Sequence, residues 1–152
     1  MKTIREIMRP SFLFLVHKTS TVSEAVHAMA EHNVGIVAVV DGDSLVGVFS
    51  ERDVVRRVVD RGLDPAHTTV AQVMTTDLVL GSVDEDCQAA MVKMDRANIR
   101  HLPIVSGGHI VSMLSIRDLM RAEIDNTGVE LEHLRAYLYQ VPPSVAVGPP
   151  VR

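Results

Sequence analysis

The chain has 152 residues and a formal net charge of −4, and no basic excess points to a nucleic-acid partner. Hydrophobic residues make up 47% of it but aromatic residues only 3%, so we expect an aliphatic core. The single cysteine, Cys87, excludes an internal disulfide and fits a reducing compartment. The apolar run 12–16 is too short for a signal peptide, and no segment approaches the roughly 20 apolar residues of a membrane span. We expect a soluble cytoplasmic protein that contacts no membrane.

Helix-start signals and apolar runs predict the elements of the first half. The capping boxes Thr3–Glu6 and Thr21–Glu24 each place a hydroxyl before a helix and a glutamate three residues on. β-Branched runs around the turn 41–43 indicate a hairpin, and Gly62 ends the last helix. In order, we expect a helical turn at 4–8, a helix at 22–32, strands at 36–40 and 45–49, and a helix at 50–60.

The same order of elements follows the polar linker 63–68. It predicts a helical turn at 70–74, a helix at 87–97, strands at 102–105 and 109–114, and a helix at 115–123. Outside this pattern, residues 129–140 form a further predicted helix with the apolar stripe Leu131, Leu134, Leu138. That stripe must cover either the core or a partner subunit. The Pro- and Val-rich tail 142–152 has the composition of a disordered segment.

An internal repeat explains why the elements recur. Gly47–Asp53 returns as Ser112–Asp118, 65 residues later, and many other positions are identical at the same offset: Ala25/Ala90, Met29/Met94, Asn33/Asn98, Val40/Val105, Gly42/Gly107, Val46/Val111 and Arg56/Arg121. One spacing held without a gap indicates a duplicated unit. We therefore predict an α/β (α+β) fold of two pseudo-twofold-related repeats, 1–62 and 69–125. Each is a small sheet flanked by helices, and the two pack sheet against sheet.

The duplicated Ser-x-x-Asp motif allows two interpretations. Ser50 with Asp53, and Ser115 with Asp118, are ordinary helix-capping pairs. The same geometry directs free backbone N–H groups at an incoming phosphate. Duplication in register favours a binding role, and the two roles can coexist.

The other arginine, histidine and cysteine residues allow further functional interpretations. Arg52 and Arg117 lie inside the motifs and suit phosphate neutralisation, whereas Arg56 and Arg121 are interpreted as solvated. His27 and His32 are five residues apart, which misses the spacing of a helical metal pair, so no metal site is predicted. Neighbouring carboxylates are expected to raise the pKa of the Cys87 thiol, which argues against a reactive cysteine.

These residues resemble a tandem pair of cystathionine β-synthase (CBS) domains, known as a Bateman module, of the small stand-alone bacterial type. The strand–Ser-x-x-Asp motif in both copies and the segment 100–105, Arg-His-Leu-Pro-Ile-Val, carry the resemblance, which covers residues 3–123. It implies a homodimer whose clefts bind AMP, ADP, ATP, NAD or S-adenosylmethionine as a regulatory ligand, with no catalytic cofactor. Ser112 departs from the family pattern, which usually has glycine there, so the backbone is expected to lie slightly farther from a ligand.

The resemblance also implies which residues share a cleft. The motif aspartate binds the ribose hydroxyls and the motif serine lies near ribose or phosphate. One cleft would contain Ser50, Arg52 and Asp53 with Ile99, Arg100 and His101. The other would contain Ser115, Arg117 and Asp118 with Val34, Gly35 and Ile36. Since only the former has an arginine and a histidine on its opposite wall, we expect it to tolerate more phosphate charge.

The leading hypothesis is a non-catalytic regulatory module that signals to an unidentified protein by a conformational change. An alternative is a constitutive dimeric interaction protein whose clefts are vestigial. An enzyme is a third hypothesis, but the sequence offers no nucleophile–base pair, metal constellation or Gly-rich phosphate loop.

Overall fold

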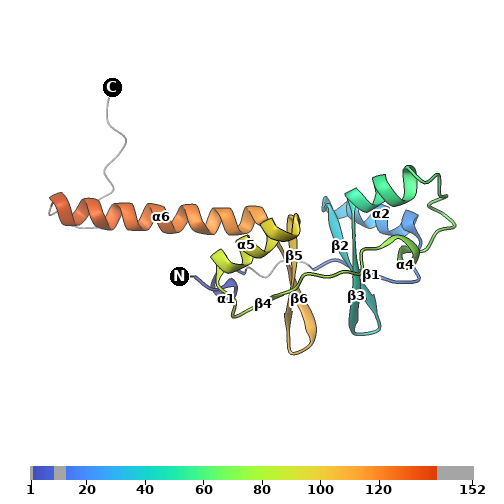
Figure 1. Ribbon diagram of the computed structural model, residues 1–152, viewed down its shortest axis with the longest axis horizontal. Coiled ribbons are helices and arrows are strands. Elements are labelled where there is room, and N and C mark those ends of the chain that lie inside the picture. Colours follow the sequence, from blue (N-terminus) through green and yellow to red (C-terminus); the bar gives the residue numbers. More distant parts are fainter. Residues whose placement is uncertain (1, 9–12, 140–152) are drawn as a thin grey trace, which may run out of the picture.

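The computed structural model describes residues 2–8 and 13–139, and its elements form two matching sets (Figure 1). The first set is α1 (Ile4–Ile7), β1 (Leu15–His17), α2 (Val22–His32), β2 (Ile36–Asp41), β3 (Ser44–Ser50), α3 (Glu51–Asp53) and the π-helix η1 (Val54–Val59). The second set is α4 (Val70–Val73), β4 (Gly81–Ser82), α5 (Cys87–Ala97), β5 (His101–Ser106), β6 (His109–Ser115) and α6 (Ile116–Tyr139). The bounds of α2, β2 and β3 recur 65 residues later, so the sequence repeat is a structural repeat.

Each repeat contains a three-stranded mixed sheet, in the orders β1-β2-β3 and β4-β5-β6. In both, the central strand pairs parallel with the first strand and antiparallel with the third. Even the irregularity of the hairpin is repeated, at Val39/Val40 and at Ile104/Val105. The predicted α/β fold is confirmed, but β1 and β4 were not predicted. At three and two residues, they are too short to show a strand pattern.

Two asparagines turn the chain from a helix into the central strand. Asn33 and Asn98 both have φ of 52°, in the left-handed region that asparagine tolerates better than most residues. They are the C-caps of α2 and α5. The turn brings residues 34–36 of one repeat and 99–101 of the other to the start of β2 and β5, which is where the clefts open.

The short helices α1 and α4, which begin the two sets of elements, each pack against the core of the other repeat. Ile4 of α1 is fully buried in the core of the second repeat, and its N–H donates to the Glu85 carbonyl oxygen at 2.9 Å. Val70 of α4 is fully buried in the core of the first repeat, and its N–H donates to the Ser20 carbonyl oxygen at 2.8 Å. The division of the sequence into 1–62 and 69–125 follows chain order. In space, however, the short first helix of each half packs into the core of the other half.

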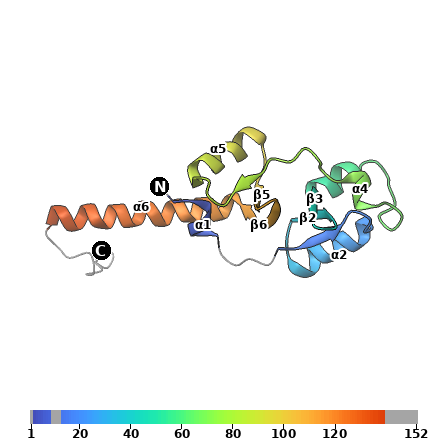
Figure 2. The ribbon, with the colours of Figure 1, turned by 90° about the horizontal axis from the view of Figure 1, so that it is seen from below.

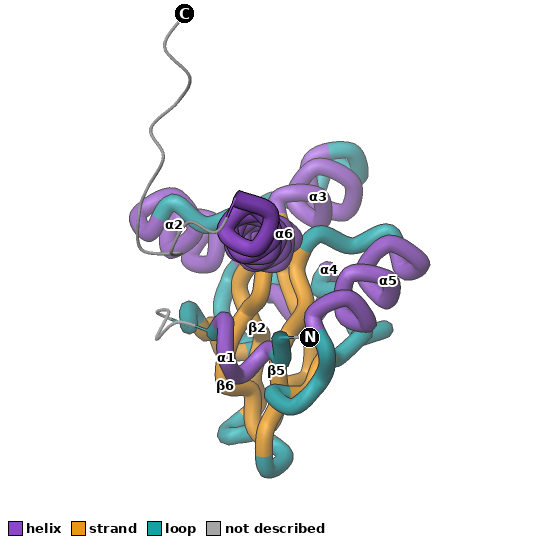
Figure 3. Tube along the Cα trace, turned by 90° about the vertical axis from the view of Figure 1, so that its left-hand side faces the viewer, coloured by secondary structure: helices purple, strands orange, loops and turns teal. Residues whose placement is uncertain are grey.

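The two cores are separate and use equivalent positions. Their buried residues are Val22, Ala25, Met29, Val37, Val39, Phe49, Val58, Val70 and Val73 in the first repeat. The second core contains Ile4, Val83, Cys87, Ala90, Met94, Leu102, Ile104, Leu114 and Leu119. The sheets stand side by side with their hairpin turns at one end, and they meet through β3 and β6. Helices α2, α3 and α6 gather at the opposite end (Figure 3).

The last helix differs from its prediction. The sequence suggested two helices, at 115–123 and 129–140, but α6 is a single helix of 24 residues that continues through Gly128. One glycine weakens a helix by about 1 kcal/mol without removing its hydrogen bonds, so it does not end the helix. Figure 2 shows α6 extending well beyond the sheets. The predicted tail 142–152 lies outside the described residues. Among the helices of the described part, none is long and apolar enough to cross a bilayer.

Candidate ligand-binding clefts

Both Ser-x-x-Asp motifs cap the helix that follows them. In the first, the Asp53 N–H donates to Ser50 Oγ at 3.3 Å, and Asp53 Oδ2 accepts from the Ser50 N–H at 3.0 Å and hydroxyl at 3.2 Å. In the second, the corresponding distances between Ser115 and Asp118 are 3.2, 2.9 and 2.6 Å. The capping interpretation of both motifs is therefore correct, and it leaves one carboxylate oxygen, Oδ1, in each motif for another role.

The two Oδ1 atoms have different surroundings. Asp53 is 6% exposed, and its Oδ1 accepts from the Thr75 hydroxyl at 3.1 Å and lies 3.6 Å from Arg57 Nε. Asp118 is exposed, and no hydrogen bond from a described residue reaches its Oδ1. Within the described residues, the duplicated motif thus presents one Oδ1 that accepts a hydrogen bond, at Asp53, and one that accepts none, at Asp118.

The first cleft, of about 440 Å³, lies between the first motif and the start of β5. It brings together all six residues predicted for it: Ser50, Arg52, Asp53, Ile99, Arg100 and His101. Its volume falls within the range of small-molecule sites. Arg56, which the sequence analysis interpreted as solvated, is exposed but also lines this cleft.

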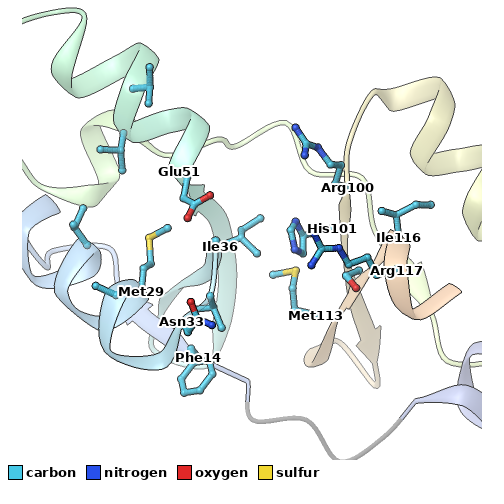
Figure 4. A pocket seen from close by; sticks show the side chains of 17 residues that line it. Phe14, Met29, Asn33, Ile36, Glu51, Arg100, His101, Met113, Ile116 and Arg117 are labelled. Atoms are coloured by element: carbon cyan, nitrogen blue, oxygen red, sulfur yellow. The ribbon is translucent and has the colours of Figure 1, made fainter. Parts of the chain in front are cut away.

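The second cleft, of about 780 Å³, lies between the start of β2 and the second motif. It brings together five of the six predicted residues: Val34, Gly35, Ile36, Ser115 and Arg117. Figure 4 shows Ile36 and Glu51 of the first repeat facing His101, Met113 and Arg117 of the second.

Asp118 lines a third pocket, of about 510 Å³, rather than the second cleft. This third pocket lies between α1 and α6 and also contains Lys2, Glu6 and Arg121. The second cleft and the third pocket both include Met113, so they adjoin at β6. A ligand that used both Asp118 and the wall of the second cleft would have to span this boundary.

Arginines dominate the charge of the first cleft. Of its four arginines, only Arg57 forms an ion pair with a described residue, and the guanidinium groups of Arg52, Arg56 and Arg100 are unpaired within that part of the chain. Arginine binds phosphate through a planar fork of donors, which suits such a cleft to a phosphorylated ligand.

His101 and Arg100 do not distinguish the clefts as predicted. Both residues line the first cleft and the second cleft, because β5 begins between them. Burial, with Arg100 as the next contributor, lowers the pKa of the His101 imidazole. The lowered pKa favours the neutral ring, which offers a stacking face or a single donor.

Gly47, the first residue of the first motif, serves a different purpose from the one its family position suggested. A Cβ placed there would lie 2.6 Å from Met74 Sδ and 2.9 Å from the Thr75 carbonyl oxygen. The glycine thus admits the segment that follows α4. Ser112 takes the equivalent place, is 2% exposed, and lines the third pocket.

Sequence reasoning missed Arg57 and Thr75. Arg57 Nη1 donates to the carbonyl oxygens of Val73 and Met74, at 3.3 and 2.6 Å, which fixes the segment containing Thr75 against η1. Neither residue belongs to a motif, and the position equivalent to Arg57 at the 65-residue offset is Ala122. Because many other positions also differ at this offset, the sequence carried no clear signal for either residue.

The described residues bring no metal-binding cluster together, and the single thiol is buried. Across residues 2–8 and 13–139, no group of three or more His, Cys, Asp or Glu side chains could hold a metal ion. Burial, followed by the charge of Asp86, raises the pKa of the Cys87 thiol, in the predicted direction.

The fold and its paired motifs are those of a CBS-domain pair. The CBS domain family model matches residues 4–60 and 70–125, and the chain belongs to this family. Among curated relatives, the CBS domain-containing protein YhcV of Bacillus subtilis (strain 168) is 32% identical over 126 residues, covering 83% of this chain and 89% of YhcV. The mitochondrial CBS domain-containing protein CBSX3 of Arabidopsis thaliana is 34% identical over 123 residues, covering 78% of this chain but only 60% of CBSX3.

Solved structures share the fold over most of the chain. A CBS-domain protein from Burkholderia ambifaria MC40-6 superimposes with a TM-score of 0.75 at 31% identity, covering 80% of this chain and 91% of that one. The CBS domain protein PAE2072 from Pyrobaculum aerophilum, solved as a complex with AMP, has a TM-score of 0.70 at 27% identity, with coverages of 77% and 89%.

Proposed function

We propose that this protein is a non-catalytic regulatory module that binds an adenosine-containing ligand between its repeats. The observation that carries the proposal is that the first motif, and the serine and arginine of the second, line openings between the repeats. Among the described residues, three guanidinium groups beside the first motif have no ion-pair partner. The AMP complex of the Pyrobaculum relative supports this ligand class.

The ligand candidates are AMP, ADP, ATP, NAD and S-adenosylmethionine. In the proposed arrangement, a motif aspartate accepts the ribose hydroxyls, and Arg52 or Arg117 meets the phosphate. Apolar residues at the strand starts, such as Ile99 and Ile36, hold the base. Occupancy then shifts the packing of one repeat against the other and changes the surface shown to a regulated protein. A cytoplasmic location, suggested by the single cysteine, is part of the same proposal.

Thermal unfolding with each of the five ligands tests the proposal. A ligand present at about 100 times its dissociation constant stabilises the folded state by about 2.7 kcal/mol. For a chain of this size, each kcal/mol raises Tm by about 2–4 °C. We expect at least one ligand to raise Tm by several degrees, and Asp118→Ala to diminish that shift. If no ligand shifts Tm, the vestigial-cleft alternative is favoured. Steady hydrolysis of an added nucleotide, abolished by Asp118→Ala, would instead support an enzyme.

We also propose that the module is a homodimer. Four apolar side chains are largely exposed: Val55 (62%) and Val59 (67%) on η1, and Met120 (53%) and Ile124 (69%) on α6. Each pair is related to the other by the 65-residue offset, so the repeat presents the same apolar feature twice. Isolated exposed apolar residues are common, but paired ones on adjacent helical turns are typical of an interface.

Sedimentation velocity of a double variant tests the homodimer. Val59→Glu combined with Ile124→Glu puts a charge on each apolar pair, and we expect the dimer to become a monomer. Val92→Glu changes a valine of α5 that is 49% exposed and outside these pairs, so it should remain dimeric. A dimer that persists in the double variant contradicts this interface.

A further inference from the structure

The carboxylates of the two motifs are not equally able to hold a pair of hydroxyl groups. A carboxylate oxygen has two lone pairs, and a vicinal diol needs two acceptor positions. In both motifs, Oδ2 accepts from the N–H and the hydroxyl of the motif serine, so its capacity is used. The diol must therefore be accepted mainly by Oδ1.

At Asp118, both lone pairs of Oδ1 are available among the described residues, and the side chain is exposed. At Asp53, Oδ1 already accepts from the Thr75 hydroxyl at 3.1 Å, and the Arg57 guanidinium lies 3.6 Å away. A diol at Asp53 thus finds one acceptor position occupied by a hydroxyl of the protein itself.

Thr75 is also held firmly in this place. Its N–H donates to the Val48 carbonyl oxygen at 2.8 Å, and its carbonyl oxygen accepts from the Val48 N–H at 3.0 Å. Arg57 binds the two carbonyl oxygens just before it. The Thr75 hydroxyl can leave Asp53 by rotating its side chain, but the backbone beside the cleft stays. A ligand diol therefore competes with a group whose local concentration is fixed by the fold.

We propose that Thr75 is an internal competitor for the ligand diol, which makes Asp53 the weaker and Asp118 the stronger diol site. The proposal rests on the proposed function, because it assumes that a motif aspartate accepts the ribose hydroxyls. It assigns Thr75 as a specificity-determining residue of the first cleft. The second motif is filled first as ligand concentration rises, and the first cleft fills only at higher concentration.

Equilibrium dialysis with radiolabelled AMP tests the proposal on the full chain. Wild-type protein is expected to bind AMP in two phases, and Asp118→Asn should remove the tighter one. In the Asp118→Asn background, Thr75→Val should then tighten the remaining phase by about 2- to 10-fold, the value of one net hydrogen bond. Thr75→Ser retains the hydroxyl and should leave the affinity unchanged.

Two controls separate competition from general effects. Thr76→Val makes the same chemical change at the adjacent exposed threonine, which does not line the cleft, and should leave AMP affinity unchanged. With 2′,3′-dideoxy-AMP as probe, Thr75→Val should have no effect, because no diol competes.

The outcomes distinguish a failure of the Thr75 assignment from a failure of the proposed adenosine binding. If AMP binds but Thr75→Val leaves the weaker phase unchanged, or tightens both probes equally, the competitor assignment is wrong while the proposed function stands. The same holds if Asp53→Asn, rather than Asp118→Asn, removes the tighter phase. If neither AMP nor the other adenosine ligands bind wild-type protein, both are wrong.

Discussion

Gly47→Ala is the substitution whose effect follows most directly from the geometry. Gly47 is a buried residue of β3, opposite Val39, and the segment after α4 crosses directly over it. An added Cβ would lie 2.6 Å from Met74 Sδ and 2.9 Å from the Thr75 carbonyl oxygen. The methionine side chain can move, but the carbonyl belongs to backbone held by the paired bonds between Val48 and Thr75. To remove the clash with the added Cβ, the whole segment that contains Thr75 must therefore shift away from β3.

Overpacking of this kind typically costs about 1–3 kcal/mol. Each kcal/mol lowers Tm by about 2–4 °C for a chain of this size, so differential scanning fluorimetry should resolve the change. Gly128→Ala is a matched control, because nothing lies within 4 Å of a Cβ there and the residue is inside α6. It should raise stability by up to about 1 kcal/mol through helix propensity. If Gly47→Ala also leaves Tm unchanged or raises it, the close approach of the Thr75 segment is wrong.

Three further predictions concern single side chains. Arg57→Met loses two hydrogen bonds and the ion pair to buried Asp53, so its free energy of unfolding, measured by urea denaturation, should fall by about 1 kcal/mol or more. The exposed Arg56→Met should stay within about 0.5 kcal/mol of wild type, and equal unfolding free energies for the two variants would contradict the role of Arg57. The pKa of His101 is lowered on folding, so its contribution to stability is present above its ordinary pKa of about 6.5 and is lost as pH falls through the lower, folded value. His101→Gln should therefore lose less stability than wild type between pH 7.5 and 5.5, and an identical pH profile refutes the assignment. Cys87 is 5% exposed with a raised pKa, so a thiol reagent at pH 8 should label it rapidly only in urea, and fast labelling of native protein would be inconsistent with its burial.

The repeat offset made most of the fold predictable from the sequence. Helices 22–32 and 87–97 have the predicted bounds, and each hairpin strand differs from prediction by one residue at most at either end. What the pattern could not reveal depends on tertiary packing. The exchange of α1 and α4 between the cores leaves no mark on local sequence, because an apolar face only requires some core to cover it.

The sequence predicted which residues gather at the first motif, but not the hydrogen bonds and pockets that surround each aspartate. The six residues that the sequence grouped around the first motif do line one cleft, because the motif and the strand start are both repeated features. The sequence could not show that Asp118 lines a separate pocket, or that Thr75, 22 residues from Asp53, engages that carboxylate. Both facts depend on long-range packing, of α1 against α6 and of the segment after α4 against β3.

A crystal structure grown with AMP tests the central claim most directly. We expect adenosine to be bound between the repeats, with the ribose hydroxyls donating to Asp118 Oδ1 at about 2.5–3.0 Å. The phosphate should lie beside an arginine of the second motif or of the strand starts. Clefts without AMP at millimolar concentration, or AMP bound away from both motifs, would contradict it.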